Sequence, residues 1–188
     1  MKCVNCRNNK LSEGARYCPE CGYPLDEKYN VTTEDYLKDT ENLGPSEFLS
    51  PDSSEPLVKL KHQDHIYLWD PSCLGVWIGK EILAGIDLEA AQIVFENLSA
   101  EDQKYLAQAK ESIKLRSSGM KSPVSENELD EHYYKALVID QDFETGGLWF
   151  DQSVVSFWYA ATQNKDVPAL TQVEELLHIL VHLRFFED

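Results

Sequence analysis

The alternation of apolar and polar residues predicts strands in the C-terminal two thirds of the chain. The stretch HIYLWDPSCLGVWIG, residues 65–79, is typical of two short strands around a turn at 70–72. Residues 132–140, 146–150 and 153–161 (HYYKALVID, GGLWF and SVVSFWYAA) are rich in β-branched and aromatic residues. Because such residues favour the pleated conformation, we expect three further strands there.

Helices are predicted where a capping residue precedes apolar positions spaced three or four apart. Asp87 can cap a helix that runs to Leu98, and Ser99 begins a second helix that Gly119 follows. A last helix starts with the capping box Thr171 and Glu174 and carries leucines on its inward face. The resulting order, β-β-α-α-β-β-β-α, favours an α+β domain with an antiparallel sheet and about three to four helices. We find no internal repeat.

Composition divides the chain into three segments. Residues 1–25 contain four cysteines, and residues 26–56 are acidic, with three prolines and a serine-rich tip. Few apolar residues recur at a useful period in this second segment, so we expect an acidic flexible linker. The alternative is a partner-binding segment that folds onto a basic, apolar groove through Tyr29, Tyr36, Leu37, Phe48 and Leu49. Residues 57–188 then form the α+β domain.

The four cysteines form two knuckles, Cys3-x-x-Cys6 and Cys18-x-x-Cys21. A two-residue gap turns both thiolates of a pair toward one point, and two such pairs complete a tetrahedral shell for Zn²⁺. A segment of this length buries too little surface to fold alone, and metal binding supplies the missing free energy. We therefore predict one structural zinc ion bound by Cys3, Cys6, Cys18 and Cys21.

The same stretch, MKCVNCRNNKLSEGARYCPECGYPL, resembles the short zinc ribbon found at the N-termini of many bacterial and archaeal proteins. The middle of that pattern is matched by Leu11, Gly14, Ala15, Arg16 and Tyr17, and the second knuckle reads Cys-Pro-Glu-Cys-Gly. Arg7 departs from the pattern, because the first knuckle usually carries glycine there. The resemblance implies metal binding and leaves the function open, since such ribbons are attached to enzymes, membrane proteins and regulators. No family is recognised over residues 57–188.

Charge narrows the classes of partner. The chain has 33 acidic and 17 basic residues and a formal net charge of −16. Residues 1–25 hold four of the basic and two of the acidic residues, so the acidity lies in the rest. Such a surface repels nucleic acid and anionic membranes and favours a basic protein partner. The N-terminal stretch is polar and no apolar run reaches the length of a membrane span, so we expect neither a signal peptide nor a transmembrane helix, and a cytoplasmic location.

A second metal site is conceivable on the last helix. Its four candidate ligands fall within one arc of a helical wheel, opposite the leucines: Glu174, Glu175, His178 and His182. The alternative is an ordinary solvated face. His62 and His65 form a weaker candidate in a loop.

Other reactive residues have structural interpretations. His132 lies in an acidic run that we interpret as a helix face. We interpret Cys73 as an inert thiol in a buried strand. The four tryptophans (Trp69, Trp77, Trp149 and Trp158) are expected in the core or in a protein-binding groove.

No phosphate-binding, dinucleotide or acyl-transfer motif is present. We therefore assign no catalytic residues and expect a non-catalytic zinc-ribbon adaptor or regulator whose acidic domain binds a protein partner. Two alternatives remain open. One is a nucleic-acid-associated or DNA-mimicking regulator that targets a DNA- or RNA-binding protein. The other is a metal-dependent enzyme that uses Glu174, His178 and His182.

Overall fold

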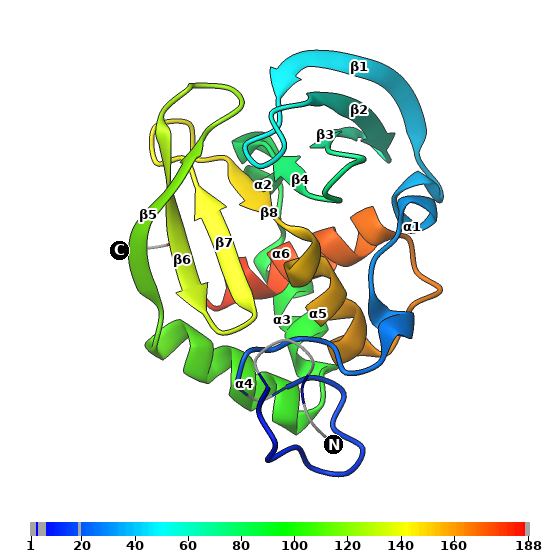
Figure 1. Cartoon of the computed structure of the whole chain (residues 1–188), viewed down its shortest axis with the longest axis vertical. Coiled ribbons are helices and arrows are strands. Elements are labelled where there is room, and N and C mark those ends of the chain that lie inside the picture. Colours follow the sequence, from blue (N-terminus) through cyan, green and yellow to red (C-terminus); the bar gives the residue numbers. More distant parts are fainter. Residues whose placement is uncertain (1–2, 4–6, 19, 187–188) are drawn as a thin grey trace.

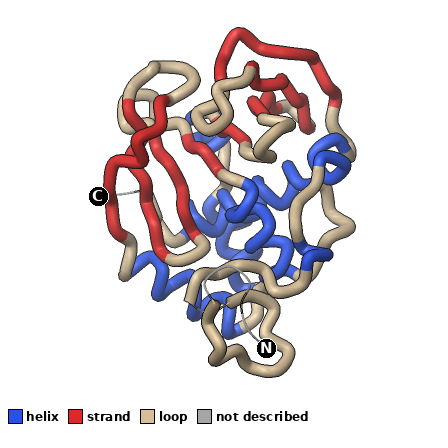
Figure 2. The backbone as a smooth tube through the Cα atoms, in the orientation of Figure 1, coloured by secondary structure: helices blue, strands red, loops and turns tan. Residues whose placement is uncertain are grey.

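The computed structural model describes residue 3 and residues 7–18 and 20–186. Within this part of the chain, one antiparallel sheet of eight strands packs against helices (Figures 1 and 2). The strands are β1 (Glu41–Leu49), β2 (Pro56–His62), β3 (His65–Trp69), β4 (Val76–Ile78), β5 (Lys114–Lys121), β6 (Glu128–Tyr134), β7 (Leu137–Gln141) and β8 (Leu148–Phe150). The helices are the 3₁₀ turn η1 (Glu27–Tyr29), α1 (Thr33–Leu37), α2 (Lys80–Ala84), α3 (Leu88–Glu96), α4 (Ala100–Glu111), α5 (Gln152–Thr162) and α6 (Ala169–His182). The predicted α+β class with an antiparallel sheet is confirmed.

The sheet consists of two similar halves that meet at β4 and β8. The strand order is β1-β2-β3-β4-β8-β7-β6-β5, so each half is a four-stranded meander and the second runs outward in the opposite direction (Figure 1). Trp77 is opposite Trp149, and the pairs on either side are Val76 with Phe150 and Ile78 with Leu148. This register is symmetric about the tryptophan pair, as an approximate two-fold axis between the strands requires.

The two halves are a structural repeat with a constant offset of 72 residues, which corrects the expectation of no repeat. In the first half, the Asp70 carboxylate accepts hydrogen bonds from the backbone of Ser72 and from the Ser53 hydroxyl. In the second half, the Asp142 carboxylate accepts the equivalent hydrogen bonds from the backbone amide of Glu144 and from the Ser125 hydroxyl. The identical residue pairs are Leu43/Leu115, Ser46/Ser118, Ser50/Ser122, Pro51/Pro123, Ser53/Ser125, Leu57/Leu129, Asp70/Asp142, Gly75/Gly147 and Trp77/Trp149.

Two apolar clusters lie on opposite faces of the sheet. The larger cluster joins the helices to one face, with Tyr67, Phe150, Trp158 and Leu177 among its fully buried members. The smaller cluster, on the other face, consists of Leu57, Leu68, Trp77, Leu129 and Trp149. All four tryptophans are buried, as expected for core residues.

Residues 153–161 form most of helix α5, so the strand expected there is wrong. Asp151 caps this helix by accepting hydrogen bonds from the backbone amides of Ser153 and Val154. Residues 154–161 are buried without interruption. A helix that is enclosed on all sides has no polar stripe, and its apolar run then looks like a buried strand.

Several other element boundaries differ from those predicted from the sequence. The helix that begins after Ser99 ends at Glu111, and residues 114–121 form strand β5 instead. Most of the acidic run before His132 belongs to strand β6, in which Leu129 and His132 are buried. The last helix begins at Ala169 after Pro168, ahead of the predicted capping box at Thr171. The caps Asp87 and Ser99 are confirmed.

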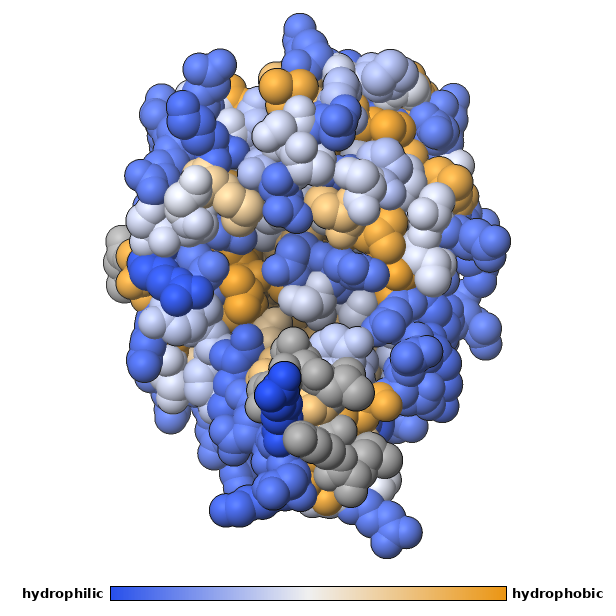
Figure 3. Space-filling model, viewed as in Figure 1, coloured by the Kyte–Doolittle hydropathy of each residue, from blue (hydrophilic) through white to orange (hydrophobic). Residues whose placement is uncertain are grey.

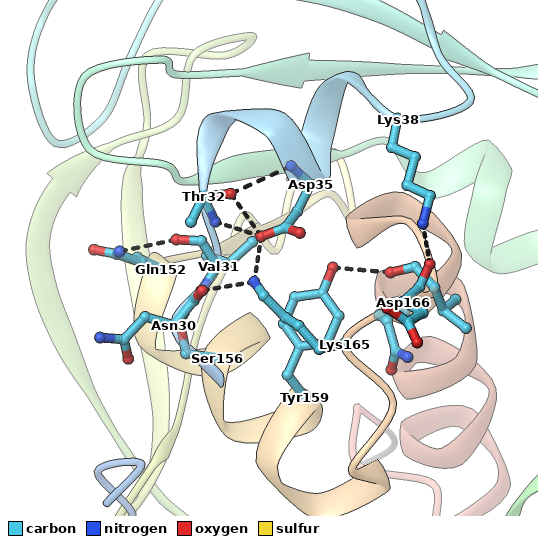
Figure 4. A network of polar contacts seen from close by, with 12 residues as sticks. Asn30, Val31, Thr32, Asp35, Lys38, Gln152, Ser156, Tyr159, Lys165 and Asp166 are labelled. Atoms are coloured by element: carbon cyan, nitrogen blue, oxygen red, sulfur yellow. Dashed lines mark hydrogen bonds and ion pairs between the residues drawn. The ribbon is translucent and has the colours of Figure 1, made fainter. Parts of the chain in front are cut away.

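The segment 26–56 carries regular structure, so the prediction of a flexible linker is wrong. It contains η1, α1 and the edge strand β1, and Tyr36 is fully buried. Figure 4 shows how residues 30–38 are tied to α5 and the loop that follows it. Lys165 donates to the Asn30 carbonyl at 2.6 Å and pairs with Asp35, while the Val31 amide donates to the Ser156 hydroxyl at 3.0 Å. Hydrogen bonds to the buried Ser156 and the half-buried Lys165 fix this acidic stretch.

Candidate functional site: a cysteine cluster docked on the acidic body

Three of the four predicted ligands converge. The sulfur atoms of Cys3, Cys18 and Cys21 lie within 4.8 Å of one another. Cys3 and Cys18 are buried, and the sulfurs of Cys3 and Cys21 are 3.7 Å apart. Two thiolates on one tetrahedral zinc ion are about 3.8 Å apart, given a Zn–S bond of about 2.3 Å. The donor set therefore fits a metal ion. Cys6, the fourth predicted ligand, lies outside the described residues.

The two knuckles are closed by equivalent backbone hydrogen bonds. The Arg7 amide donates to the Cys3 carbonyl at 3.0 Å, and the Gly22 amide donates to the Cys18 carbonyl at 2.7 Å. Both closing residues are left-handed, with φ of 62° at Arg7 and 70° at Gly22. Arg7 thus has the same closing bond and positive φ as Gly22, although the pattern that the sequence resembles usually has glycine there. The left-handed conformation costs a non-glycine residue a small amount of free energy.

The cysteine segment is docked on the body through Arg16. Its guanidinium pairs with Asp102 at 2.8 Å and donates to the carbonyls of Ala160 and Ala161 near the C-terminal end of α5. A cation is favoured there, because the last carbonyls of a helix carry partial negative charge. Asp102 is 1% exposed and lies at the start of α4. A single arginine therefore links the segment to two helices of the body.

Neighbouring residues extend this contact. The Tyr17 hydroxyl donates to the other oxygen of Asp102 at 3.0 Å, and its ring packs edge-on against Tyr105 and Phe157. Burial, followed by the charge of Asp102, raises the pKa of Tyr17, so the phenol stays a donor. A Cβ on Gly22 would stand 1.8 Å from that of Ala136, in the turn between β6 and β7. The segment is packed closely against the body at both points.

In the described structure, the four candidates on the last helix do not bring three donor atoms together. Glu174 and His178 line a cavity of about 140 Å³ together with Gln63 and His65. Glu175 lines a different cavity beside Trp158, and burial raises its pKa. The His182 ring lies 5.2 Å from that of Phe95. Among the described residues, the cysteine cluster is the set of three potential ligands whose donor atoms meet.

His62 has a structural role. It is buried, and its two ring nitrogens contact the Asp39 carbonyl and the Thr171 hydroxyl, both at 3.0 Å. Glu174 accepts a hydrogen bond of 2.7 Å from the Tyr67 hydroxyl nearby. His65 is half-buried and lines the cavity beside Glu174.

The remaining candidates are structural as well. His132 is buried in β6, with one ring nitrogen 2.7 Å from the Gln141 side-chain oxygen, so it does not lie on a helix face. Cys73 lies in the turn before β4, outside any strand, and donates to Asp70 at 3.1 Å. Burial and that hydrogen bond raise the pKa of the thiol to about 12, which favours the protonated, less nucleophilic form.

Sequence reasoning missed Arg16 and Asp102 as partners, because 86 residues separate them. It also missed Asp140 on β7, which is 2% exposed and has a carboxylate oxygen, Oδ1, without a hydrogen-bond partner in the described structure. The one available signal was an acidic residue inside an otherwise apolar strand pattern, LVID. None of the helices in the described part combines the length and apolar character needed to cross a bilayer.

Comparison with family models, curated proteins and solved structures finds no match to the chain.

Proposed function

We propose that this protein is a non-catalytic adaptor or regulator: a structural zinc ion holds the N-terminal ribbon on the body, and the acidic body binds a basic protein partner. The zinc would be bound by Cys3, Cys6, Cys18 and Cys21. Zinc is preferred to other metals because the donor set is thiolate and no redox role is needed.

The observation that carries the binding role is the excess of carboxylates on a well-ordered body. Ion pairs with Arg16, Lys28, Arg116 and Lys165 use four of the acidic residues. Many others are exposed, and Figure 3 shows hydrophilic residues over most of the face in view, with apolar residues in small separate groups. A surface of one sign speeds association with a partner of the opposite sign.

The test uses the intact chain as bait in native cell extract, with retained proteins identified at increasing salt. We expect a basic protein that is released as salt rises, because screening shortens to about 8 Å near physiological ionic strength. Retention that depends on nucleic acid, and is lost after nuclease treatment, would contradict the proposal. Release of the same protein by added duplex DNA would favour the DNA-mimicking regulator instead. Turnover of a substrate that is lost in His178→Ala would favour an enzyme.

A further inference from the structure

The repeat provides an internal comparison for four acidic residues, three in the second half and one in the first. Counting back 72 residues, Asp140 corresponds to Leu68, Glu131 to Lys59 and Asp151 to Gly79, while the loop residue Asp52 of the first half corresponds to Val124. Leu68, Lys59, Gly79 and Val124 line a mainly apolar cavity of about 320 Å³ beside Trp77. The same backbone thus folds with leucine where the second half has Asp140. The fold therefore does not require a carboxylate at the position of Asp140.

The acidic residues of the second half lie together. Strand register places Glu131 opposite Asp140 and Asp140 opposite Trp149, so the three share the face of the smaller apolar cluster. Burial and the charges of Glu131 and Asp151 raise the pKa of Asp140, and burial raises the pKa of Asp151, to which the charge of Asp52 adds. We call Asp52, Glu131, Asp140 and Asp151 the acidic cluster.

Asp140 is the member that points to a ligand. It is 2% exposed, and its Oδ1 atom has no hydrogen-bond partner in the described structure. The neighbouring Ser118 hydroxyl donates to the Leu129 carbonyl at 3.0 Å. Leaving a buried carboxyl oxygen unsatisfied is costly, and the leucine of the first half shows that an apolar side chain serves the fold. A buried polar group that destabilises the fold is typical of a functional site.

The charge and spacing of the cluster favour an organic cation. Arg116 pairs with Glu131 at 2.5 Å, so the chain already places one guanidinium at this edge. Among the ion pairs of the described residues, the other three carboxylates have no basic partner, and of these Asp151 also accepts hydrogen bonds as the N-cap of α5. No three of these carboxylates bring their oxygens within the 4.8 Å that the cysteine sulfurs meet. A guanidinium or ammonium group with several donors suits wider spacing better than a bare metal ion does.

We propose that the acidic cluster is a binding site for an organic cation, the guanidinium or ammonium group of an arginine or lysine side chain on a protein partner. This inference rests on the proposed binding function and specifies where one basic side chain is recognised. Burial and the charges of Glu131 and Asp151, opposed by Ser118 and Arg116, raise the pKa of Asp140 to about 7. Because the cation attracts the ionised form, binding releases a proton and strengthens from pH 6 to pH 8.

The test titrates the full chain with N-acetyl-arginine N-methylamide and its lysine counterpart, with the uncharged citrulline analogue as the ligand control. The indole N–H signal of Trp149, beside Asp140, should shift in NMR spectra, while that of Trp77, its counterpart in the repeat, should stay in place. Asp140→Leu copies Leu68 and should weaken binding about tenfold or more, since a buried charge loses its partner. Asp64→Asn, an exposed acid in another turn, should leave binding unchanged.

Equal affinity in Asp140→Leu, or equal binding of citrulline, would overturn the site. If Asp140→Leu does not fold, Asp140→Asn provides the same comparison with a near-isosteric side chain. Binding of spermidine without binding of either amino-acid probe would overturn the assignment to a protein side chain. A basic partner still captured by the Asp140→Leu chain would exclude the acidic cluster while preserving the proposed function. Loss of all basic partners from the native chain would reject the function itself.

Discussion

Trp77 and Trp149 are register partners across the central strands β4 and β8, and each indole lies against a glycine of the other half. A Cβ on Gly75 would stand 2.1 Å from the Trp149 ring, and one on Gly147 would stand 2.2 Å from the Trp77 ring. The two contacts are related by the repeat. The two contacts pack the halves closely together where β4 meets β8. Glycine is needed at both positions, because only a residue without a side chain lets an indole lie so close to the backbone.

Gly75→Ala and Gly147→Ala should each lower the free energy of unfolding by about 1–3 kcal/mol, because the ring and the new methyl group cannot both fit. The repeat predicts similar losses for the two variants. Gly85→Ala is the control, since its nearest neighbour would be 3.6 Å from the added carbon. Urea unfolding followed by tryptophan fluorescence measures all three. A loss in only one of the pair would show that the two contacts are not equivalent.

Removal of the proposed metal ion should destabilise the body as well as the cysteine segment. Arg16 and Tyr17 bring this segment into contact with Asp102 and Phe157, so the segment and the helices are expected to unfold together. The measurements are zinc content and thermal unfolding of the native chain, with and without chelator, and of a Cys18→Ser, Cys21→Ser double variant. Cys73→Ser serves as control because this thiol lies outside the cysteine cluster. An unfolding midpoint of the body that chelation does not change would contradict the coupling.

Lys165→Met should expose residues 26–40 to proteolysis. In the native chain this stretch is bound to Lys165 through the Asn30 carbonyl and the Asp35 carboxylate (Figure 4). Removing the ammonium leaves the Asn30 carbonyl without this donor and the Asp35 carboxylate with only its hydrogen bonds from Thr32, at a cost of about 1–3 kcal/mol, and local opening becomes more frequent. Limited proteolysis with mass spectrometry measures the first cut. The control is Lys28→Met, because Lys28 forms an exposed ion pair with Asp26. Rapid cutting of the native chain within 26–40 would contradict this packing.

Asp140 should give the chain a pH-dependent stability near neutrality. Its folded pKa is raised to about 7, above the ordinary value of 3.8, so the folded state holds a proton that the unfolded state loses. Stability from this group is therefore complete below about pH 4 and falls as pH rises toward 7, by at most about 1.4 kcal/mol per pH unit. Asp140→Asn should remove this slope. Unfolding free energies at pH 5, 6 and 7 test it, and parallel curves for the native chain and the variant would refute it.

The sequence by itself determined the features that depend on near neighbours. The spacing of Cys3, Cys18 and Cys21 was sufficient to predict their convergence, because knuckle geometry involves only a few residues. The caps Asp87 and Ser99 and the strands near residues 65–78 were readable for the same reason. The antiparallel sheet followed from short strands separated by turn residues.

Tertiary structure decided the rest. Helix α5 is enclosed on all sides, so no polar stripe marks it as a helix, and only packing against the sheet and α6 selects that conformation. Lys165 orders residues 30–35 from 130 or more positions away, and composition alone gives no account of such a contact. The repeat could not be recognised in the sequence, because only a few identical residues are needed to conserve the two indole–glycine contacts and the two buried aspartates. Asp140 became a candidate only when the fold placed it opposite Trp149 and at the position where the first half has leucine. Local chemistry is encoded in short spacings, whereas burial and long-range partners exist only after the chain has folded.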